Sequence, residues 1–426
     1  MSPIVITLAI LIIMIAGFIS GKFPLGMCGM FAALALMVTG VLTPAETFAG
    51  FANTNVVIMF SMMVVAGGLM RTHLIENIMK LINRIGGGTE TSIVVGFGLV
   101  MILMSQFMNA FVALACLLPF VTGMCEDMKV SPTRVVFPLC IIGNVWVVLL
   151  PIGLGASAFA QQNAFLEAFG AEPVFGVWTL ALTRLVPAIL TTLYSIFILP
   201  KYCPAAPSLP IQSGVGKKAG TGTLSKGKET CAYIITILTV LMMMTSTLHG
   251  IQPVVCASVG AFLTVLLGIL NHKEAIASVG WDVLFMFAGI MSLASALTNT
   301  GASDVVANAI QTLLGGTTNP WIINIAFSVV ICIMTQFLSN NAMINVFTPL
   351  ALMITTKLGM NPVGIMGLMW IAGCASFITP MATPGIPLSM QAAGYNFKDI
   401  VKMGVIPSLV ALVSGIIWCT LMFPAY

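Results

Sequence analysis

Apolar residues dominate this chain in long runs, and short polar segments separate one run from the next. Runs long enough to cross about 30 Å of hydrocarbon as helices recur along the whole length, without the alternation typical of membrane β-strands. We interpret the first run as a span rather than a signal peptide, because no basic region precedes it. The runs predict about ten spanning helices, at residues 3–20, 25–42, 55–70, 134–158, 178–199, 231–248, 252–270, 283–298, 362–394 and 404–422.

Two further apolar segments, residues 91–122 and 319–352, are each interrupted by a polar turn. The first contains SQFMNAFVALACLLP, beginning at Ser105, and the second contains TQFLSNNAMINVFTP, beginning at Thr335. Each limb is about 15 residues long, which is short for a full span and predicts a re-entrant hairpin. Two ordinary antiparallel spans joined by a polar turn at the far surface remain the alternative.

The two halves of the chain repeat one another. A linker at residues 201–230, rich in Gly, Ser, Pro and Lys, separates a first repeat at residues 1–200 from a second at 231–426. Five crossings in each half give the repeats opposite orientations, the architecture of many secondary transporters. The fold class predicted is an all-α polytopic membrane protein with two inverted repeats, two broken helices and two hairpins. At an offset of 230 residues, Gln106 matches Gln336, Pro119 matches Pro349, Pro132 matches Pro362, Gly143 matches Gly373 and Gly155 matches Gly385.

The spans at 134–158 and 362–394 each contain helix breakers at their centre. The second includes SFITPMATPGIPLSM, and a helix cannot continue through Pro380, Pro384 and Pro387. The first includes LLPIGLGAS, from Leu149 to Ser157. Carbonyls freed at such breaks, with nearby Ser, Thr and Asn oxygens, suit a hard cation such as sodium, and half-helix N-termini suit carboxylates.

Charge is scarce and unevenly placed. Only 7% of residues are charged and 59% are hydrophobic, and mean hydropathy is +1.09. All but two of the 16 Lys and Arg lie on one side of the predicted topology, which puts the linker in the cytoplasm and both termini outside an inner (cytoplasmic) cell membrane. The exceptions are Lys357 and Arg184; we expect Arg184, within a span, to snorkel or pair. Residues 73–85 predict a helix along the inner interface.

The sequence disfavours enzymatic chemistry. Its ten cysteines are scattered singly, and its three histidines accompany no metal-site or phosphate-loop motif. No nucleophile with a base appears, and no nucleic-acid partner or cofactor is expected beyond a coupling ion. Broken helices at the centre of inverted repeats favour an occluded site over a continuous channel, so a secondary transporter in a lipid bilayer is the function predicted.

The polar motifs resemble those of the divalent-anion:sodium symporter family, which includes dicarboxylate, citrate and sulfate permeases. That family has a Ser-Asn-Thr type signature at each hairpin tip, matched by Ser339, Asn340 and Asn341. It has an Ala-Thr-Pro-Pro type break, matched by ATPG from Ala382 to Gly385, and a following stretch seen here as GYNFKDIVKMG. The resemblance spans the whole chain. It implies a homodimer with an elevator mechanism that carries a di- or tricarboxylate with sodium or a proton, or exchanges anions.

The expected site combines the motifs with this resemblance. Ala110 and Gly153 stand opposite Asn340 and Thr383, which weakens the expected first-half cation site. The large membrane subunit of binding-protein-dependent TRAP-type carriers has a similar repeat and is the alternative. We expect Asn144 and Asn345 to be packing residues. The expected anion-binding residues are Asn109, Asn340, Asn341, Thr383, Pro384 and Gly385, and the expected cation-binding residues are Ser105, Asn109, Gly153, Gly155, Thr335, Ser339, Asn340 and Ala382.

Overall fold

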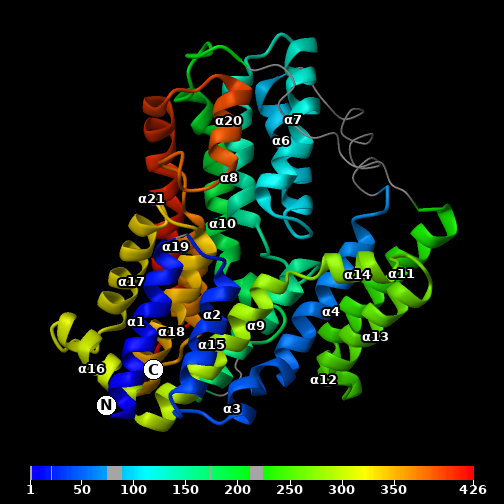
Figure 1. The fold of residues 1–426 in the computed structure, drawn as a ribbon. Coiled ribbons are helices and arrows are strands. Elements are labelled where there is room, and N and C mark those ends of the chain that lie inside the picture. Colours follow the sequence, from blue (N-terminus) through cyan, green and yellow to red (C-terminus); the bar gives the residue numbers. More distant parts are fainter. Residues whose placement is uncertain (1, 21, 74–88, 172–174, 212–223) are drawn as a thin grey trace.

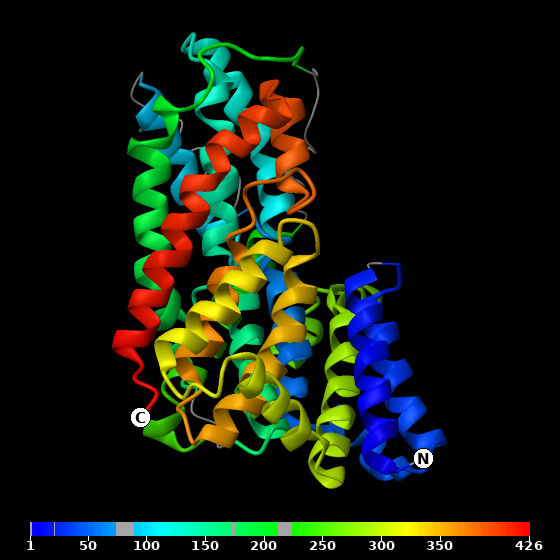
Figure 2. The same cartoon turned by 90° about the vertical axis from the view of Figure 1, so that its left-hand side faces the viewer.

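A computed structural model describes residues 2–20, 22–73, 89–171, 175–211 and 224–426, and all regular secondary structure within them is helical. The expected all-α fold is therefore confirmed. Both termini lie toward the same end of the molecule (Figures 1 and 2). Most of the interfacial helix expected at residues 73–85, and the middle of the 201–230 linker, lie outside the described residues.

The helices that precede the hairpin in each half of the chain form two groups, which follow a similar order and pack on each other through α2 and α15. Helix α2 packs along α15 so closely that a Cβ at Gly289 would lie 2.1 Å from the carbonyl oxygen of Gly29, and glycine at this crossing lets the backbones touch. The first group contains α1 (Pro3–Ser20), α2 (Leu25–Val38), α3 (Pro44–Phe48), η1 (Ala49–Ala52) and α4 (Thr54–Leu69). The second contains α11 (Lys226–Met244), α12 (Ser246–His249), α13 (Pro253–Leu266), α14 (His272–Ser278), α15 (Trp281–Thr300) and α16 (Ala302–Leu313).

Two helical hairpins stand where the sequence predicts them. The first is α6 (Glu90–Met104) with α7 (Ala110–Asp127), and the second is α17 (Pro320–Met334) with α18 (Asn340–Leu358). Polar residues begin these limbs because their side chains satisfy free backbone N–H groups: Asn109 accepts from Phe111 at 2.9 Å, and Asn319 accepts from Trp321 at 2.9 Å.

Both predicted helix breaks are present. The first separates α8 (Val136–Trp146) from α9 (Leu154–Ala168), and the second separates α19 (Val363–Cys374) from α20 (Gly385–Ala393). The predicted end of the first broken helix, residue 158, is wrong, because α9 continues through Gln161 and Asn163. Both polar side chains are buried and paired: Gln161 donates to Asn345 at 3.0 Å, and Asn163 donates to the Phe175 carbonyl at 3.1 Å.

The limbs of each broken helix pack in different places. Limb α8 contacts its own hairpin, α6 and α7, whereas α9 contacts α4, α15 and the opposite hairpin limb α18. Limb α19 contacts its own hairpin, α17 and α18, whereas α20 contacts α7 and α8 of the first half. Figure 1 shows α20 beside α8, α6 and α7 at the end of the molecule away from the termini. The two breaks are thereby brought together between the hairpins.

The helices differ in whether they are long enough to cross a membrane. Among the described residues, four helices are long and apolar enough to cross a membrane: α1, α7, α10 continued through η3, and α21. Two bent helix pairs in the same part of the chain raise that number to 6. Several other helices of the described chain are apolar but shorter than a full span, including α6 and α17. The elements not yet given are η2 (Pro132–Arg134), α10 (Thr179–Phe197), η3 (Leu199–Lys201) and α21 (Phe397–Met422).

Candidate functional site

A cavity of about 480 Å³ lies where the two hairpin tips meet the two helix breaks. None of the described residues that line it carries a formal charge, and its polar groups are carboxamides and hydroxyls. The lining residues are Met108, Asn109, Ala110, Asn144, Val147, Val148, Leu154, Ser339, Asn340, Asn341, Trp370, Cys374, Met381, Ala382, Thr383 and Pro384.

Four helices begin at the wall of this cavity. Asn109 precedes α7, Leu154 is the first residue of α9, Ser339 precedes α18 and Pro384 precedes α20. A helix N-terminus carries free N–H groups and about half an elementary positive charge. Four such ends offer N–H donors and partial positive charge to an anion without a basic side chain.

The tip of the second hairpin forms an oxygen-rich cluster with the second break. The Thr335 hydroxyl donates to Asn340 Oδ1 at 2.7 Å and to the Gly373 carbonyl at 3.0 Å, and Asn340 Nδ2 donates to Ser376 Oγ at 2.8 Å. Thr335 and Ser376 are fully buried. Hydroxyl, carboxamide and carbonyl oxygens in this number fit a hard cation such as sodium. Gly373 and Ser376 were not among the expected cation-binding residues, although the 230-residue match of Gly143 with Gly373 pointed to this place.

The tip of the first hairpin is poorer in oxygens. The Ser105 hydroxyl donates to the Ile102 carbonyl of its own helix at 2.9 Å, and the Asn109 carboxamide caps α7. Ala110 stands at the position of Asn340 and has no side-chain oxygen. The asymmetry expected from sequence therefore extends to the hydrogen bonds.

A glutamine fastens each hairpin tip to the break beside it. Gln106 donates to the Trp146 carbonyl at 2.8 Å and accepts from the Leu150 N–H at 2.8 Å. Gln336 donates to the Ala375 carbonyl at 3.1 Å and accepts from the Ile378 N–H at 3.0 Å. The two side chains make the same bonds at matching positions, so the glutamines have a positioning role that the sequence reasoning did not assign.

The three glycines among the expected site residues lie behind the side chains that line the cavity. Gly153 has φ +57°, and a Cβ there would lie 2.6 Å from the Gln106 carbonyl oxygen. A Cβ at Gly155 would overlap the Leu150 carbonyl oxygen, and one at Gly385 would lie 3.0 Å from Cys140 Sγ. These three residues permit close backbone approach and do not line the cavity.

The structure divides the expected site residues into two sets. Asn109, Ser339, Asn340, Asn341, Ala382, Thr383 and Pro384 line the cavity, whereas Ser105, Gly153, Gly155, Thr335 and Gly385 lie behind its wall. The expectation that Asn144 only packs was wrong, because it lines the cavity and donates to the Cys140 carbonyl at 3.0 Å. Asn345, expected to pack, bonds Gln161 instead of lining the cavity.

Of the two expectations for Arg184, snorkelling and pairing, the structure contradicts snorkelling. Its side chain is 2% exposed, and its guanidinium donates to the carbonyls of Val145, Val147 and Val148 at 3.2, 3.0 and 3.4 Å. The guanidinium carbon also lies 5.1 Å from the centre of the Trp370 ring. The carbonyls freed by the first break therefore hold Arg184 within the protein, where it cannot reach the surface.

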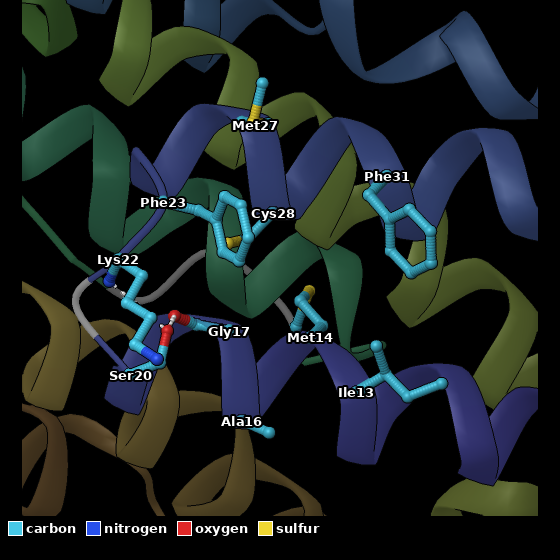
Figure 3. A pocket seen from close by; sticks show the side chains of 10 residues that line it. All are labelled: Ile13, Met14, Ala16, Gly17, Ser20, Lys22, Phe23, Met27, Cys28 and Phe31. Carbon is cyan, nitrogen blue, oxygen red and sulfur yellow. Dashed lines mark hydrogen bonds between the residues drawn. The ribbon is translucent and has the colours of Figure 1, made fainter.

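A second cavity, of about 430 Å³, lies between α1 and α2 (Figure 3). Its walls are apolar apart from Lys22 and Ser20, and the Ser20 hydroxyl already donates to the Gly17 carbonyl at 2.8 Å. Figure 3 shows Phe23, Met27 and Phe31 on its α2 side. A cavity with so few polar groups does not fit a small multivalent anion.

Two solved structures share this fold, and both are transporters. The YdaH transporter of Alcanivorax borkumensis has a TM-score of 0.63 at 13% identity, covering 91% of this chain and 87% of that one. The Neisseria gonorrhoeae MtrF structure, from a class of antimetabolite efflux pumps, has a TM-score of 0.62 at 11% identity, covering 100% of this chain and 96% of that one. At these identities the two structures show that the chain shares their fold.

The particular family follows from sequence comparison. The family model described as citrate transporter (CitMHS) matches residues 9–352, and this chain belongs to that family. It is 20% identical over 445 residues to the sodium-dependent dicarboxylate transporter SdcS of Staphylococcus saprophyticus, covering 96% of this chain and 84% of that protein. It is 24% identical over 445 residues to dicarboxylate transporter 1, chloroplastic, of Arabidopsis thaliana, covering 96% and 76%. These relatives confirm the resemblance to the divalent-anion:sodium symporter family.

Other relatives match over shorter stretches. The uncharacterized transporter sll0640 of Synechocystis sp. is 26% identical over 203 residues, which are 45% of this chain and 32% of that protein. The matched segments thus span about a third of the length of such relatives.

Proposed function

We propose that this protein is a secondary active transporter that carries a small di- or tricarboxylate across the inner membrane together with sodium. One observation carries the proposal: four helix N-termini and the carboxamides of both hairpin tips converge on one cavity of about 480 Å³. That volume suits a small organic anion, since small-molecule sites in proteins are typically about 300–1,000 Å³. The name of SdcS, a sodium-dependent dicarboxylate transporter, supports the same assignment.

The charge of such a substrate is balanced by the site. A dicarboxylate brings two negative charges, and each helix N-terminus offers about half a positive charge. Asn109, Asn144, Asn340 and Asn341 each offer a carboxamide at the cavity wall. A sodium ion in the cluster of Thr335, Asn340, Gly373 and Ser376 would add a full positive charge close to the substrate. Binding of anion and cation would then favour each other electrostatically, which is the basis of symport.

We propose an elevator movement of the hairpins and broken helices in a homodimer. The exchange of limbs between halves supports this, because α20 packs on α7 and α8 of the first half, and α9 contacts α18 of the second half as well as α4 and α15. Helices α1, α2, α4, α11, α13 and α15 would form the scaffold. The apolar side chains that α11 and α13 expose, including Ile237 and Phe262, suit contact with lipid or a second copy.

Transport by the purified protein in liposomes tests the function. We expect saturable uptake of radiolabelled succinate or citrate, counterflow against the same unlabelled anion, and stimulation by an inward sodium gradient. A proton gradient in place of sodium separates the two coupling ions. Single-channel currents in planar bilayers, or no uptake of any di- or tricarboxylate by folded protein, would overturn the proposal.

A further inference from the structure

We propose that Arg184 is a resident cation that permanently takes the place of a coupling ion at the first helix break, so that only the second half of the transporter binds sodium. The inference rests on the proposed function only for its transport readout, since its cation-binding readout needs no substrate. Its basis is that the guanidinium bonds backbone carbonyls that could otherwise bind a coupling ion.

The two breaks can be aligned by their glutamine braces. Gln106 binds the Trp146 carbonyl and Gln336 binds the Ala375 carbonyl, so the next residues, Val147 and Ser376, occupy equivalent places. In the second half, the Ser376 hydroxyl belongs to the oxygen cluster around Asn340. In the first half, a valine stands there, and its side chain offers no oxygen to a cation.

What the first half has instead is a built-in positive charge. Arg184 Nη2 donates to the carbonyls of Val145 and Val147 at 3.2 and 3.0 Å, and Nη1 donates to that of Val148 at 3.4 Å. These are backbone oxygens at the C-terminal end of α8, where the helix dipole attracts a cation. A sodium ion at such a break would be held by the same kind of oxygens.

The residue that corresponds to Arg184 in the second half is uncharged. Pro187 within α10 and Pro407 within α21 align these two helices, which places Gly404 at the position of Arg184. A Cβ at Gly404 would lie 1.9 Å from the Phe377 carbonyl oxygen, so no side chain stands between α21 and the second break. The second break therefore lacks a resident cation at this place, whereas its oxygen cluster is complete. The first half thus has a fixed positive charge at its break, whereas the second half offers oxygens to a cation.

The buried charge also has no acidic partner. Among the residues that the structure describes, the ion pairs are Arg71 with Glu274, His73 with Glu229 and Arg134 with Glu90, and Arg184 is in none of them. Burying a charge without an acidic partner costs free energy, and an ionisable residue kept in such a place is a candidate for a function. Arg184 lies directly behind Val147, Val148 and Trp370, all of which line the cavity, so its charge remains felt by an anion bound there.

The backbone at this place supports the same interpretation. Val148 has φ +54°, a conformation that a β-branched residue rarely adopts. It is held there by the Arg184 guanidinium on its carbonyl and by the Ser105 carbonyl, which accepts from its N–H at 3.1 Å. Arg184 therefore fixes the shape of the first break as well as its charge, as a bound ion would.

The test counts sodium ions in purified protein without substrate. Thermal stability is measured against sodium concentration, with choline keeping the ionic strength constant. We expect a single-site curve for the wild type and for Arg184→Lys, which keeps the charge. In Arg184→Gln the three carbonyls lose their cation, and we expect a second sodium to bind: a steeper curve, with a Hill coefficient rising from about 1 toward 2 and a midpoint several-fold higher. Arg134→Gln removes an arginine that is paired with Glu90 and contacts none of these carbonyls, so the sodium curve should keep its single-site shape.

Two results would overturn the inference: a wild type that already binds two sodium ions, or a folded Arg184→Gln whose sodium curve matches the wild type. If Arg184→Gln does not fold, the sodium-to-anion ratio of the wild type, measured from reversal potentials in liposomes, decides between one sodium ion and more. If the wild type carries no carboxylate, the proposed function fails while the thermal titration still reports on Arg184.

Discussion

The Oε1 atom of Gln336 accepts a hydrogen bond from the backbone N–H of Ile378 at 3.0 Å, across the boundary between a hairpin tip and a helix break. The same side chain donates to the Ala375 carbonyl, so one carboxamide bonds a free carbonyl and a free N–H of the unwound turn. Gln106 does the same for Trp146 and Leu150 in the first half. A broken helix buried in a membrane protein requires such partners, because water is not available to its free backbone groups.

Replacing this brace should destabilise the protein. In Gln336→Ala, the partly buried Ile378 N–H loses its partner and the buried Ala375 carbonyl keeps only the weak Cys332 thiol donor, at a cost of about 2 kcal/mol. We expect a lower unfolding temperature in detergent. Gln252→Ala serves as the matched control, because Gln252 is exposed at the start of α13 and makes no side-chain cap. Equal unfolding temperatures for both variants would show that the brace is energetically unimportant.

Asn340 joins the anion cavity to the cation cluster. Its Oδ1 accepts from Thr335 and its Nδ2 donates to Ser376, and the residue lines the cavity. Asn340→Ala should weaken substrate and sodium binding together, by about 10- to 100-fold, since hydrogen bonds to charged groups are worth about 1.5–3 kcal/mol. Succinate and citrate uptake in liposomes measures the loss, and Asn308→Ala on the exposed face of α16 should transport normally. Wild-type uptake by Asn340→Ala would remove this residue from the site.

The two hairpin tips should differ in their sodium dependence. Thr335 belongs to the oxygen cluster, whereas the Ser105 hydroxyl is bonded to its own helix. Wild-type uptake should therefore depend on sodium with a shallow, single-site shape. Thr335→Ala should raise the sodium concentration for half-maximal uptake by about tenfold, the loss of roughly one ligand interaction, and Ser105→Ala should change it little. A steep sodium dependence that both substitutions abolish equally would show that the first tip binds sodium as well.

Gly153 should tolerate no side chain. Its φ of +57° disfavours other residues, and a Cβ would collide with Phe107 and the Gln106 carbonyl oxygen. Gly153→Ala should lower the unfolding temperature and displace the first hairpin tip, which reduces uptake. The control is Gly123→Ala in α7, where a Cβ meets nothing within 4 Å and should stabilise the helix by up to about 1 kcal/mol. If both variants behave alike, the packing at the first break is looser than the contacts indicate.

The side of the membrane on which each loop lies follows from the distribution of Lys and Arg. In a background without the partly exposed Cys116 and Cys231, a cysteine at Ala171 should react with an impermeant maleimide only from outside. A cysteine at Ser208, in the linker, should react only from the cytoplasmic side. The reverse pattern would invert the predicted topology.

Local chemistry explains what the sequence determined by itself. Helix breaks near Pro151 and Pro384 could be predicted because several prolines and glycines cluster there. Single prolines inside α7, α10, α18 and α21 do not end those helices. The hairpins could be predicted because an apolar limb of 15 residues, α6 or α17, leads into a polar turn, and the same turn occurs twice. The second limbs, α7 and α18, are 18 and 19 residues long, so their length gives no such signal. Scarcity of charge determined the membrane environment in the same direct way, since apolar runs need hydrocarbon around them.

Only the tertiary structure decided which side chains meet. Arg184 and Val147 are far apart in the chain, and nothing in either segment alone shows that the guanidinium turns inward to carbonyls rather than outward to water. The polar residues of α9 were read as the end of a span, because their partners, such as Asn345, come from the other half of the chain. The placement of Asn144 on the cavity depends likewise on the packing of α20 against α8. Periodicity and helix breakers act over a few residues, whereas a cavity between the two halves of the chain is made by contacts between segments that are up to hundreds of residues apart.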